Sequence, residues 1–229
     1  MIDKHSELEF KFSAEEVSVD WFRTWCIGLD PVGYKSRAYP DSYYRNGDAA
    51  VRHRAWPLPG GELTVKRRKS ADSIVDRQEI NLQFAAEVSL RDVTEFLGAT
   101  GWALEFTLLK HFSHVFWYKH GEATICVSLY EVERADTNET RRFLEVEVER
   151  DSEISETTAR ELLDLWGGAA AHEFGLDEPM TSSLWEIYSG RRYSSIDICN
   201  RPPPGWLCTR GPHVDGPCAA VAGTQESPQ

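Results

Sequence analysis

The chain has 229 residues, of which 41% are hydrophobic and 27% are charged, so it can bury one sizeable core. Its formal net charge of -12 argues against a surface that binds nucleic acid or an anionic membrane, because such partners need a basic surface. No apolar run reaches about 18 residues, and the polar N-terminus does not resemble a signal peptide, so we expect a cytoplasmic protein. Five cysteines without CxxC spacing favour free thiols.

The first predicted strand is Glu7-Leu8-Glu9-Phe10-Lys11, in which ionisable and apolar residues alternate. Successive side chains of a strand point to opposite faces, so Glu7, Glu9 and Lys11 share one face. Taken alone, this pentapeptide favours a solvated edge strand. Burying such a row is costly unless a ligand of mixed charge lies against it.

The next elements follow from capping, periodicity and turn signals. Ser13 with Glu16 has the capping-box pattern and predicts a helix over 14–27. Asn46-Gly47 and His120-Gly121 are predicted turns between strands. The remaining predicted strands are 39–45, 51–54, 63–68, 77–82, 108–118, 123–132 and 143–149. The remaining predicted helices are 89–97, 156–172 and 182–188.

The composition changes beyond about residue 191 to proline, glycine, serine and cysteine. We therefore predict one domain over 1–191 and an irregular tail over 192–229.

Nearly all of the predicted strands have one apolar and one charged face. A sandwich whose charged faces meet water would also alternate, but exposed strand faces usually mix in uncharged polar residues. A closed barrel with inward charges and helices over its apolar outer side accounts for both faces. We therefore predict an α+β fold built on a closed antiparallel eight-stranded β-barrel. Its lumen would contain Glu7, Glu9, Lys11, Arg52, Arg54, Lys66, Arg68, Arg77, Glu79, Lys110, Glu145 and Glu147.

Acids and bases in one lumen indicate a metal and a polyphosphate. Mg²⁺ and Mn²⁺ prefer carboxylate and phosphate oxygens and often bridge the two. Arginine and lysine then neutralise the remaining phosphate charge.

These strands resemble the CYTH superfamily, the triphosphate tunnel metalloenzymes that include class IV adenylate cyclase, thiamine triphosphatase and inorganic triphosphatase. The resemblance covers about residues 5–188. Its elements are Glu7-Leu8-Glu9-Phe10-Lys11 (ExExK), Asp41-Ser42-Tyr43-Tyr44, Val51-Arg52-His53-Arg54, Leu63-Thr64-Val65-Lys66, Arg77-Gln78-Glu79, Lys110, Phe143-Leu144-Glu145-Val146-Glu147 and the segment 174–186.

The resemblance implies a role for each matching residue. The implied ligands of one or two Mg²⁺ or Mn²⁺ ions are Glu7, Glu9, Glu145 and Glu147. The implied triphosphate ligands are Lys11, Arg52, Arg54, Lys66, Arg77 and Lys110. Glu79 would complete the ion network of the lumen, and Lys11 with Tyr43 matches the pair proposed to activate water in the thiamine triphosphatase branch.

The chain departs from the family pattern at three positions. Arg45 and Tyr130 stand where acids are usual, and Phe112 stands where an arginine is usual, two residues after Lys110. Fewer acids weaken the case for a second metal ion, and the missing arginine would loosen one phosphate contact.

We therefore expect a divalent-metal-dependent phosphohydrolase that cleaves the terminal phosphoanhydride of inorganic, thiamine or nucleoside triphosphate. One alternative is a class IV-type adenylate cyclase, and another is a catalytically weak polyphosphate- or nucleotide-binding module. The expected partner is a small-molecule triphosphate, with no nucleic acid and no membrane, and a homodimer is left open.

Overall fold

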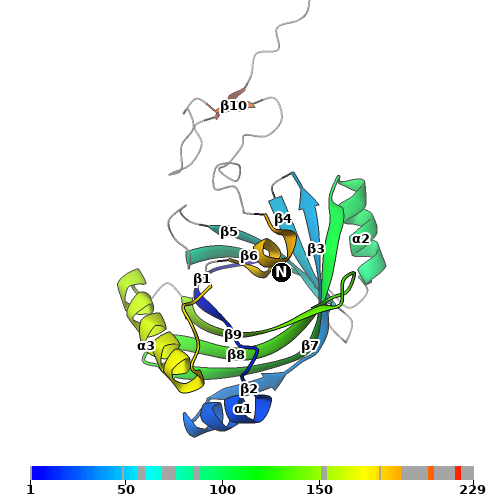
Figure 1. Cartoon of the computed structure of the whole chain (residues 1–229). Helices are drawn as coiled ribbons and strands as arrows, with labels where there is room; N and C mark the ends of the chain where they lie inside the picture. The colour runs from blue at the N-terminus through cyan, green and yellow to red at the C-terminus, as the bar shows by residue number, and fades with distance from the viewer. Residues whose placement is uncertain are drawn as a thin grey trace, which may run out of the picture.

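The computed structural model describes residues 2–47, 49–55, 60–68, 76–84, 88–150, 154–180, 182–191, 206–208 and 220–222. At 2–7, 66–68, 76–79, 90, 150, 206–208 and 220–222 it describes the backbone alone. The main element is a nine-stranded antiparallel sheet that curves strongly, with helices on its outer side (Figure 1). The predicted α+β class is confirmed.

Nine strands form this sheet in the order β2-β7-β3-β4-β5-β6-β1-β9-β8, and β8 also pairs with β7. They are β1 (Ile2–Ser13), β2 (Gly33–Ser36), β3 (Tyr39–Asn46), β4 (Ala49–Ala55), β5 (Gly61–Arg68), β6 (Asp76–Phe84), β7 (Ala103–His120), β8 (Ala123–Arg134) and β9 (Glu139–Arg150). The sequence did not predict β2. Closure of eight strands into a barrel stays a prediction, because the outermost strands in this order, β2 and β8, do not pair with each other.

Both predicted hairpin turns are present. The β3–β4 pairing ends at Asn46 opposite Ala49, and the β7–β8 pairing ends at His120 opposite Ala123. Gly47 and Gly121 have φ values of 58° and 60°, which glycine adopts without the steric cost that a Cβ would add.

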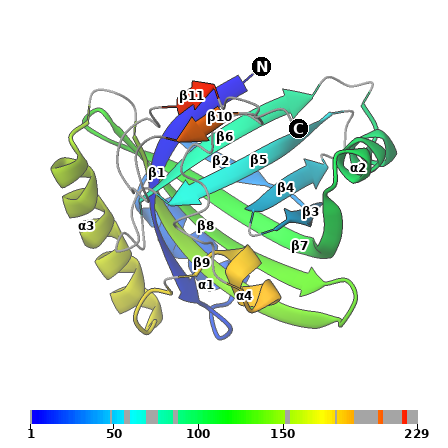
Figure 2. The same cartoon turned by 90° about the horizontal axis from the view of Figure 1, so that it is seen from above.

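The first three helices lie on the outer side of the sheet, whereas the last lies within its curve. The helices are α1 (Val19–Gly28), α2 (Leu90–Ala99), α3 (Glu156–Phe174) and α4 (Leu184–Ser189). In Figures 1 and 2, α1 and α3 lie outside the strands β1, β8 and β9, and α2 lies beside β3 and β7. Each large aliphatic side chain buried there contributes about 1.5–3 kcal/mol.

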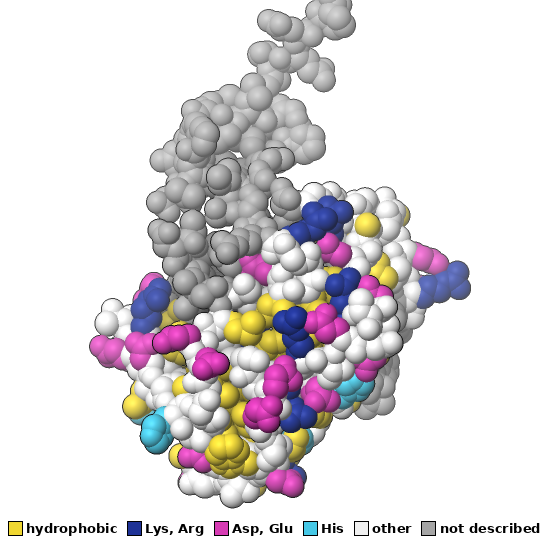
Figure 3. Space-filling view, in the orientation of Figure 1, with side chains coloured by type: hydrophobic (Ala, Val, Ile, Leu, Met, Phe, Trp, Pro, Cys, Tyr) yellow, Lys and Arg dark blue, Asp and Glu magenta, His cyan; other side chains and the backbone are white. Residues whose placement is uncertain are grey.

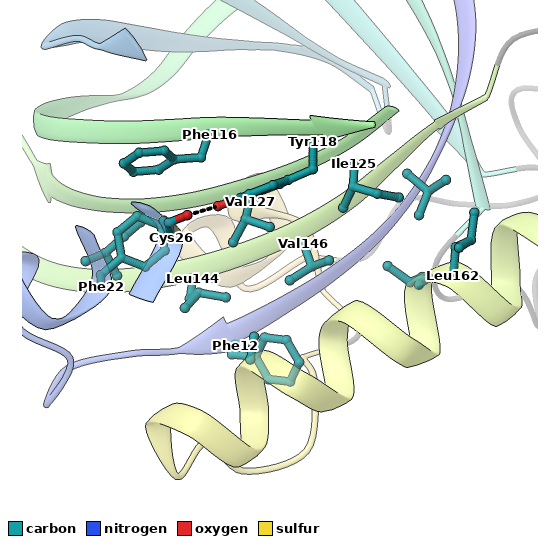
Figure 4. Packing of buried hydrophobic residues seen from close by; sticks show 14 of the residues in the cluster. Phe12, Phe22, Cys26, Phe116, Tyr118, Ile125, Val127, Leu144, Val146 and Leu162 are labelled. Atoms are coloured by element: carbon teal, nitrogen blue, oxygen red, sulfur yellow. Dashed lines mark hydrogen bonds between the residues drawn. The ribbon is translucent and has the colours of Figure 1, made fainter. Parts of the chain in front are cut away.

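The main core lies between the sheet and the helices α1 and α3 (Figure 4). Val127 and Val146 from the sheet face Phe22 of α1 and Leu162 of α3 in this core. Burial raises the pKa of the Cys26 thiol to about 12, so Cys26 is an inert core thiol. Cys26 and Cys126 are free thiols, as the cysteine pattern predicted.

The helix α1 begins later than the capping pattern predicted. The N–H of Ala14 donates to the carbonyl of Arg142, so the chain is still tied to β9 just after Ser13, the last residue of β1. Ser18 is the N-cap, and its side chain accepts a hydrogen bond from the N–H of Trp21. The strand pairing therefore overrides the local capping signal of Ser13 and Glu16.

A bulge in β7 changes which side chains face inward. The pairing with β8 shifts register between Lys110 and Phe112, so His111 is an extra residue. Side chains of even-numbered residues such as Lys110 line the inner side before the bulge, and odd-numbered ones such as Ser113 line it afterwards. Phe112 packs against the outer core and carries the Arg142 guanidinium over its ring. The position that follows Lys110 in the lumen is therefore Ser113, not Phe112.

Beyond residue 191, the structure describes two short strands, β10 (Trp206–Cys208) and β11 (Ala220–Ala222), which pair antiparallel with each other. The division into a domain over 1–191 and a tail over 192–229 stays a prediction. Among the helices that the structure describes, none is long and apolar enough to cross a membrane.

Candidate functional site

The inner side chains of the sheet line a cavity of about 350 Å³. The alternation of charged and apolar residues therefore places charges inward, as the sequence predicted. The predicted site residues that line the cavity are Glu9, Lys11, Tyr43, Arg52, Arg54, Lys110, Glu145 and Glu147.

The side chains of the other four predicted site residues lie outside the described part of the structure. Their backbones are described within β1, β5 and β6. Glu7 pairs opposite Arg77, and Lys66 pairs opposite Glu79.

One side of the cavity, which we call the acidic wall, consists of Glu9 and Lys11 on β1 and Glu145, Glu147 and Glu149 on β9. Register places Lys11 opposite Glu145 and Glu9 opposite Glu147. The Lys11 ammonium lies 2.7 Å from a carboxylate oxygen of Glu9 and 2.7 Å from one of Glu145. Glu149, which the sequence placed only at the end of its strand, also lines the cavity.

Tyr130, which stands where the family usually has an acid, is bonded to this wall. Its hydroxyl donates to a carboxylate oxygen of Glu145 at 2.6 Å, and the Lys110 ammonium lies 4.0 Å from its ring centroid. Burial raises the pKa of Tyr130 well above its usual value, and the Glu145 charge adds to the effect. Burial also tends to raise the pKa of Glu145, but the charges of Lys11 and Lys110 and the contact with the Lys11 ammonium together lower that pKa.

The opposite side, which we call the basic wall, consists of Arg52 and Arg54 on β4, Lys110 on β7, and Tyr39 and Asp41 on β3. Arg54 donates two hydrogen bonds to Asp41, at 2.8 and 2.9 Å. The Asp41 side chain is fully buried. Burial tends to raise the pKa of Asp41, but the Arg54 guanidinium together with the charges of Arg52 and Lys110 holds that pKa below its ordinary range.

Arg52 is held by the neighbouring strand β5. Its guanidinium donates to the Thr64 hydroxyl at 2.9 Å and to a carboxylate oxygen of Glu62 at 3.4 Å. The Thr64 hydroxyl in turn donates to Glu62 at 3.1 Å. This chain of bonds fixes the guanidinium at the cavity surface.

Tyr39 lies between the cations of the basic wall. The Lys110 ammonium is 3.5 Å from its hydroxyl, and the Arg54 guanidinium carbon is 4.5 Å from its ring centroid. Burial tends to raise the pKa of Tyr39, but the charges of Lys110 and Arg54 together lower it. The cation cluster would therefore stabilise negative charge on an oxygen placed beside it.

The donor set of the acidic wall fits a hard divalent ion by type, because it offers carboxylates on adjacent strands that line the cavity, with Glu9 buried among them. Within the described residues, no three acidic, histidine or cysteine side chains already converge as a ready-made metal site. The Lys11 ammonium bridges Glu9 and Glu145 and neutralises part of their charge. A metal ion bound by these two carboxylates would neutralise that charge in its place.

Met180 and the segment 182–189 lie at one end of the cavity. The N–H of Met180 donates to the carbonyl of Lys11 at 2.6 Å, and Leu184 and Trp185 line the cavity and pack with the inner tyrosines Tyr43 and Tyr130. Figure 1 shows α4 within the curve of the sheet. Ser183 and Glu186 cap this helix reciprocally, so its position is well defined.

The sequence analysis missed several residues of the cavity. Asp41 and Tyr39 are in phase with Tyr43 on β3, and this alternation could have found them. Lys35 and Arg37 also line the cavity, but β2 carried no strand signal that we used.

Arg45, the third departure from the family pattern, is bonded to the carbonyl of Gly47 and lies 3.6 Å from Glu105. Neither Arg45 nor Glu105 is among the described residues that line the cavity.

Comparisons with known proteins show no matching family model and no matching curated protein. A conserved hypothetical protein from Pyrococcus furiosus aligns with a TM-score of 0.55 and 19% identity, over 79% of this chain and 99% of its own. A Pyrococcus horikoshii protein aligns with a TM-score of 0.56 and 18% identity, over 81% and 99%. The likeness is one of fold. A candidate adenylate cyclase from Bacillus halodurans aligns over 81% of this chain and 98% of its own, at 16% identity, but its TM-score of 0.47 is too low to carry an argument.

The face seen in Figure 3 mixes charges of both signs among the described residues. On the face seen in Figure 3, described acidic and basic side chains lie close together with hydrophobic ones between them. Opposite charges are thus adjacent both outside and inside the cavity.

Proposed function

We propose that the chain is a divalent-metal-dependent phosphohydrolase that cleaves the terminal phosphoanhydride of a triphosphate. The observation that best supports this proposal is the single cavity in which a wall of carboxylates faces a wall of cations. Cations bind the phosphate oxygens, and carboxylates hold hard divalent ions that phosphate oxygens also bind. A triphosphate with its metal ion uses both walls at once.

We also infer that eight of the strands act as the tunnel of the triphosphate tunnel metalloenzymes. The pairings that support this run β7-β3-β4-β5-β6-β1-β9-β8, and β8 then pairs with β7 again. On this interpretation β2 is an additional strand beside β7. A tunnel of eight strands is just wide enough to enclose side chains and one small ligand.

The basic wall would bind the triphosphate. Arg54 uses its Nε and one terminal nitrogen for Asp41, which fixes its plane and leaves its other N–H groups as donors to phosphate. Arg52 is held through one terminal nitrogen by Thr64 and Glu62. The remaining proposed phosphate ligands are Lys11, Lys66, Arg77 and Lys110.

The acidic wall would hold Mg²⁺ or Mn²⁺. The proposed ligands are Glu7, Glu9, Glu145 and Glu147, with Glu79 completing the network. The bound ion would neutralise phosphate charge and polarise the phosphorus–oxygen bonds. Tyr130 keeps one oxygen of Glu145 occupied by a hydrogen bond, which orients the carboxylate.

Hydrolysis requires a water oriented in line with the terminal phosphorus. The oxygen of that water bonds to phosphorus, the bridging phosphorus–oxygen bond breaks, and the leaving diphosphate takes the bond electrons. Lys11 and Tyr43 are the proposed pair that orients the water and takes its proton. The Lys11 ammonium donates hydrogen bonds to Glu9 and Glu145. To take a proton from the water, it must first give up one of its own protons and move away from these carboxylates.

Phosphorus NMR tests the proposal with Mg²⁺ or Mn²⁺ and, in separate tubes, inorganic triphosphate, ATP and thiamine triphosphate. We expect orthophosphate together with a diphosphate product, and no product when EDTA removes the metal. Pyrophosphate with a cyclic nucleotide would instead make the chain a cyclase. Shifted lines without turnover in all three tubes would make it a binding module.

A further inference from the structure

Trp117 is an aromatic side chain in a charged cavity. It lies on β7, is half-buried and lines the cavity. Within the part of the chain that the structure describes, its ring joins no hydrophobic cluster and no aromatic pair, and its indole N–H has no hydrogen-bond acceptor. A large aromatic residue that contributes to no core calls for another explanation.

The other described tryptophans have clear packing roles. Trp185 at the covered end is buried and donates to Glu105 at 2.7 Å, and Trp21 donates to Glu173 at 2.9 Å. The rest pack against aromatic or aliphatic neighbours: Trp25, Trp102 and Trp166. Trp117 therefore differs from the tryptophans that hold the fold together.

Two small residues flank Trp117 in the sheet. It pairs opposite Gly33 on β2 and opposite Cys126 on β8. A Cβ built on Gly33 would lie 3.4 Å from a ring carbon of Trp117, so the ring lies against this glycine. Cys126, on the other side, is small and also lines the cavity.

The same register row leads to the acidic wall. Cys126 pairs opposite Glu147, and Glu147 pairs opposite Glu9. Adjacent strands are about 4.8 Å apart, so the backbones of Trp117 and Glu147 are separated by roughly 10 Å. An aromatic group that stacks on Trp117 would thus lie next to the proposed metal and phosphate ligands.

We propose that Trp117 stacks against an aromatic heterocycle at the organic end of the substrate, so that the site prefers a heterocyclic triphosphate ester to inorganic triphosphate. This inference rests on the proposed function, because it assumes that the charged walls hold the triphosphate. The cavity of about 350 Å³ falls within the range of roughly 300–1,000 Å³ that is typical of organic ligands. Stacking on an aromatic side chain strengthens binding on the order of tenfold to a hundredfold, whichever heterocycle is bound.

The test is calorimetric binding of ATP, thiamine triphosphate and inorganic triphosphate, each with Mg²⁺, to the wild type and to Trp117→Ala and Trp117→Phe. We expect Trp117→Ala to weaken binding of at least one heterocyclic triphosphate on the order of tenfold to a hundredfold. Binding of inorganic triphosphate should change less than about twofold. Trp117→Phe, which keeps an aromatic ring, should retain most of the affinity and also serves if the alanine variant does not fold. The heterocyclic ligand whose binding is weakened shows whether the preferred ester is a nucleoside triphosphate or thiamine triphosphate.

Trp21→Ala is the matched control, because Trp21 is an exposed tryptophan outside the cavity. Equal losses for all three ligands, no loss for either heterocycle, or no binding of any heterocyclic ester to the wild type would overturn the inference. Turnover by the same proteins is measured separately. A selective loss of heterocycle binding without turnover would refute the proposed hydrolysis and leave the stacking role standing. Turnover without a selective loss of heterocycle binding would refute the stacking role and leave the proposed hydrolysis standing.

Discussion

On the acidic wall one ammonium, that of Lys11, is bonded to two carboxylates, whereas on the basic wall Arg54 is held by both oxygens of a single buried aspartate. The bidentate pair has a fixed plane and a dedicated counter-charge, so the basic wall is organised before any ligand arrives. Lys11 is a point charge shared between Glu9 and Glu145, and a bound cation can replace it. The basic wall is thus organised without a ligand, and the acidic wall is adjustable.

Asp41→Asn is the change that should damage the preformed wall most. It leaves the Arg54 guanidinium without its buried counter-charge, so we expect the free energy of unfolding to fall by roughly 3–5 kcal/mol. Urea denaturation of both proteins measures this difference. Glu95→Gln removes an exposed ion pair with Arg91 and should leave the urea midpoint of unfolding nearly unchanged. A loss for Asp41→Asn no larger than that of this control would show that the buried pair does not organise the wall.

The same variant gives a pH dependence. Burial tends to raise the pKa of Asp41, but Arg54 together with Arg52 and Lys110 keeps it below its unfolded value of about 3.9. A carboxyl with a depressed folded pKa contributes stability that is fully present above the unfolded pKa and is lost as the pH falls through the folded pKa. The stability gap between wild type and Asp41→Asn should therefore be constant from pH 7 to about 5 and narrow below about 4. A gap that does not narrow in acid would contradict the assigned charge.

Glu147→Gln tests the adjustable wall. Removing one proposed metal ligand should lower metal-dependent phosphate release at least on the order of a hundredfold while the fold is retained, and Glu9→Gln should do the same. Phosphate release at several Mg²⁺ concentrations and a circular dichroism spectrum measure the two effects. Glu131→Gln is the matched control, because Glu131 is bonded to Arg142 at 2.7 Å and does not line the cavity. Activity that survives both cavity substitutions would mean that the acidic wall does not hold the metal.

The smallest expected effect concerns the electrostatic potential of the two walls, which the pKa values of two tyrosines report directly. The pKa of Tyr130 is raised by burial and by Glu145, whereas at Tyr39 the charges of Lys110 and Arg54 outweigh burial and lower the pKa. In an absorbance titration, Tyr39→Phe should remove a phenol that ionises below the usual value of about 10. Tyr130→Phe should remove one that ionises above it. If both variants remove phenols that ionise at the same pH, the two walls do not differ in potential.

The sequence was sufficient to predict the two strands of the acidic wall. Glu9 and Lys11 on β1 and Glu145 and Glu147 on β9 alternate with apolar residues, and both strands keep a period of two through these positions. The hairpin turns could also be predicted, because asparagine and glycine carry the local conformation that such turns need.

The remaining features depend on pairing between distant strands. The bulge at His111 moves the inward position from Phe112 to Ser113, and no local signal in β7 marks it. The start of α1 was wrong because β9 holds the chain extended just past Ser13. Trp117 could not be singled out because a sequence does not show which aromatic residue lacks a core.

The cover that α4 forms over one end of the cavity has a kinetic consequence. A ligand whose leading end contacts Trp185 cannot leave the cavity at that end. The part of the ligand that enters first is therefore the last to leave. If the phosphate chain enters ahead of the organic group, the larger product lies nearer the opening after cleavage and is released before orthophosphate. Orthophosphate left behind in the site would then compete with the next substrate molecule.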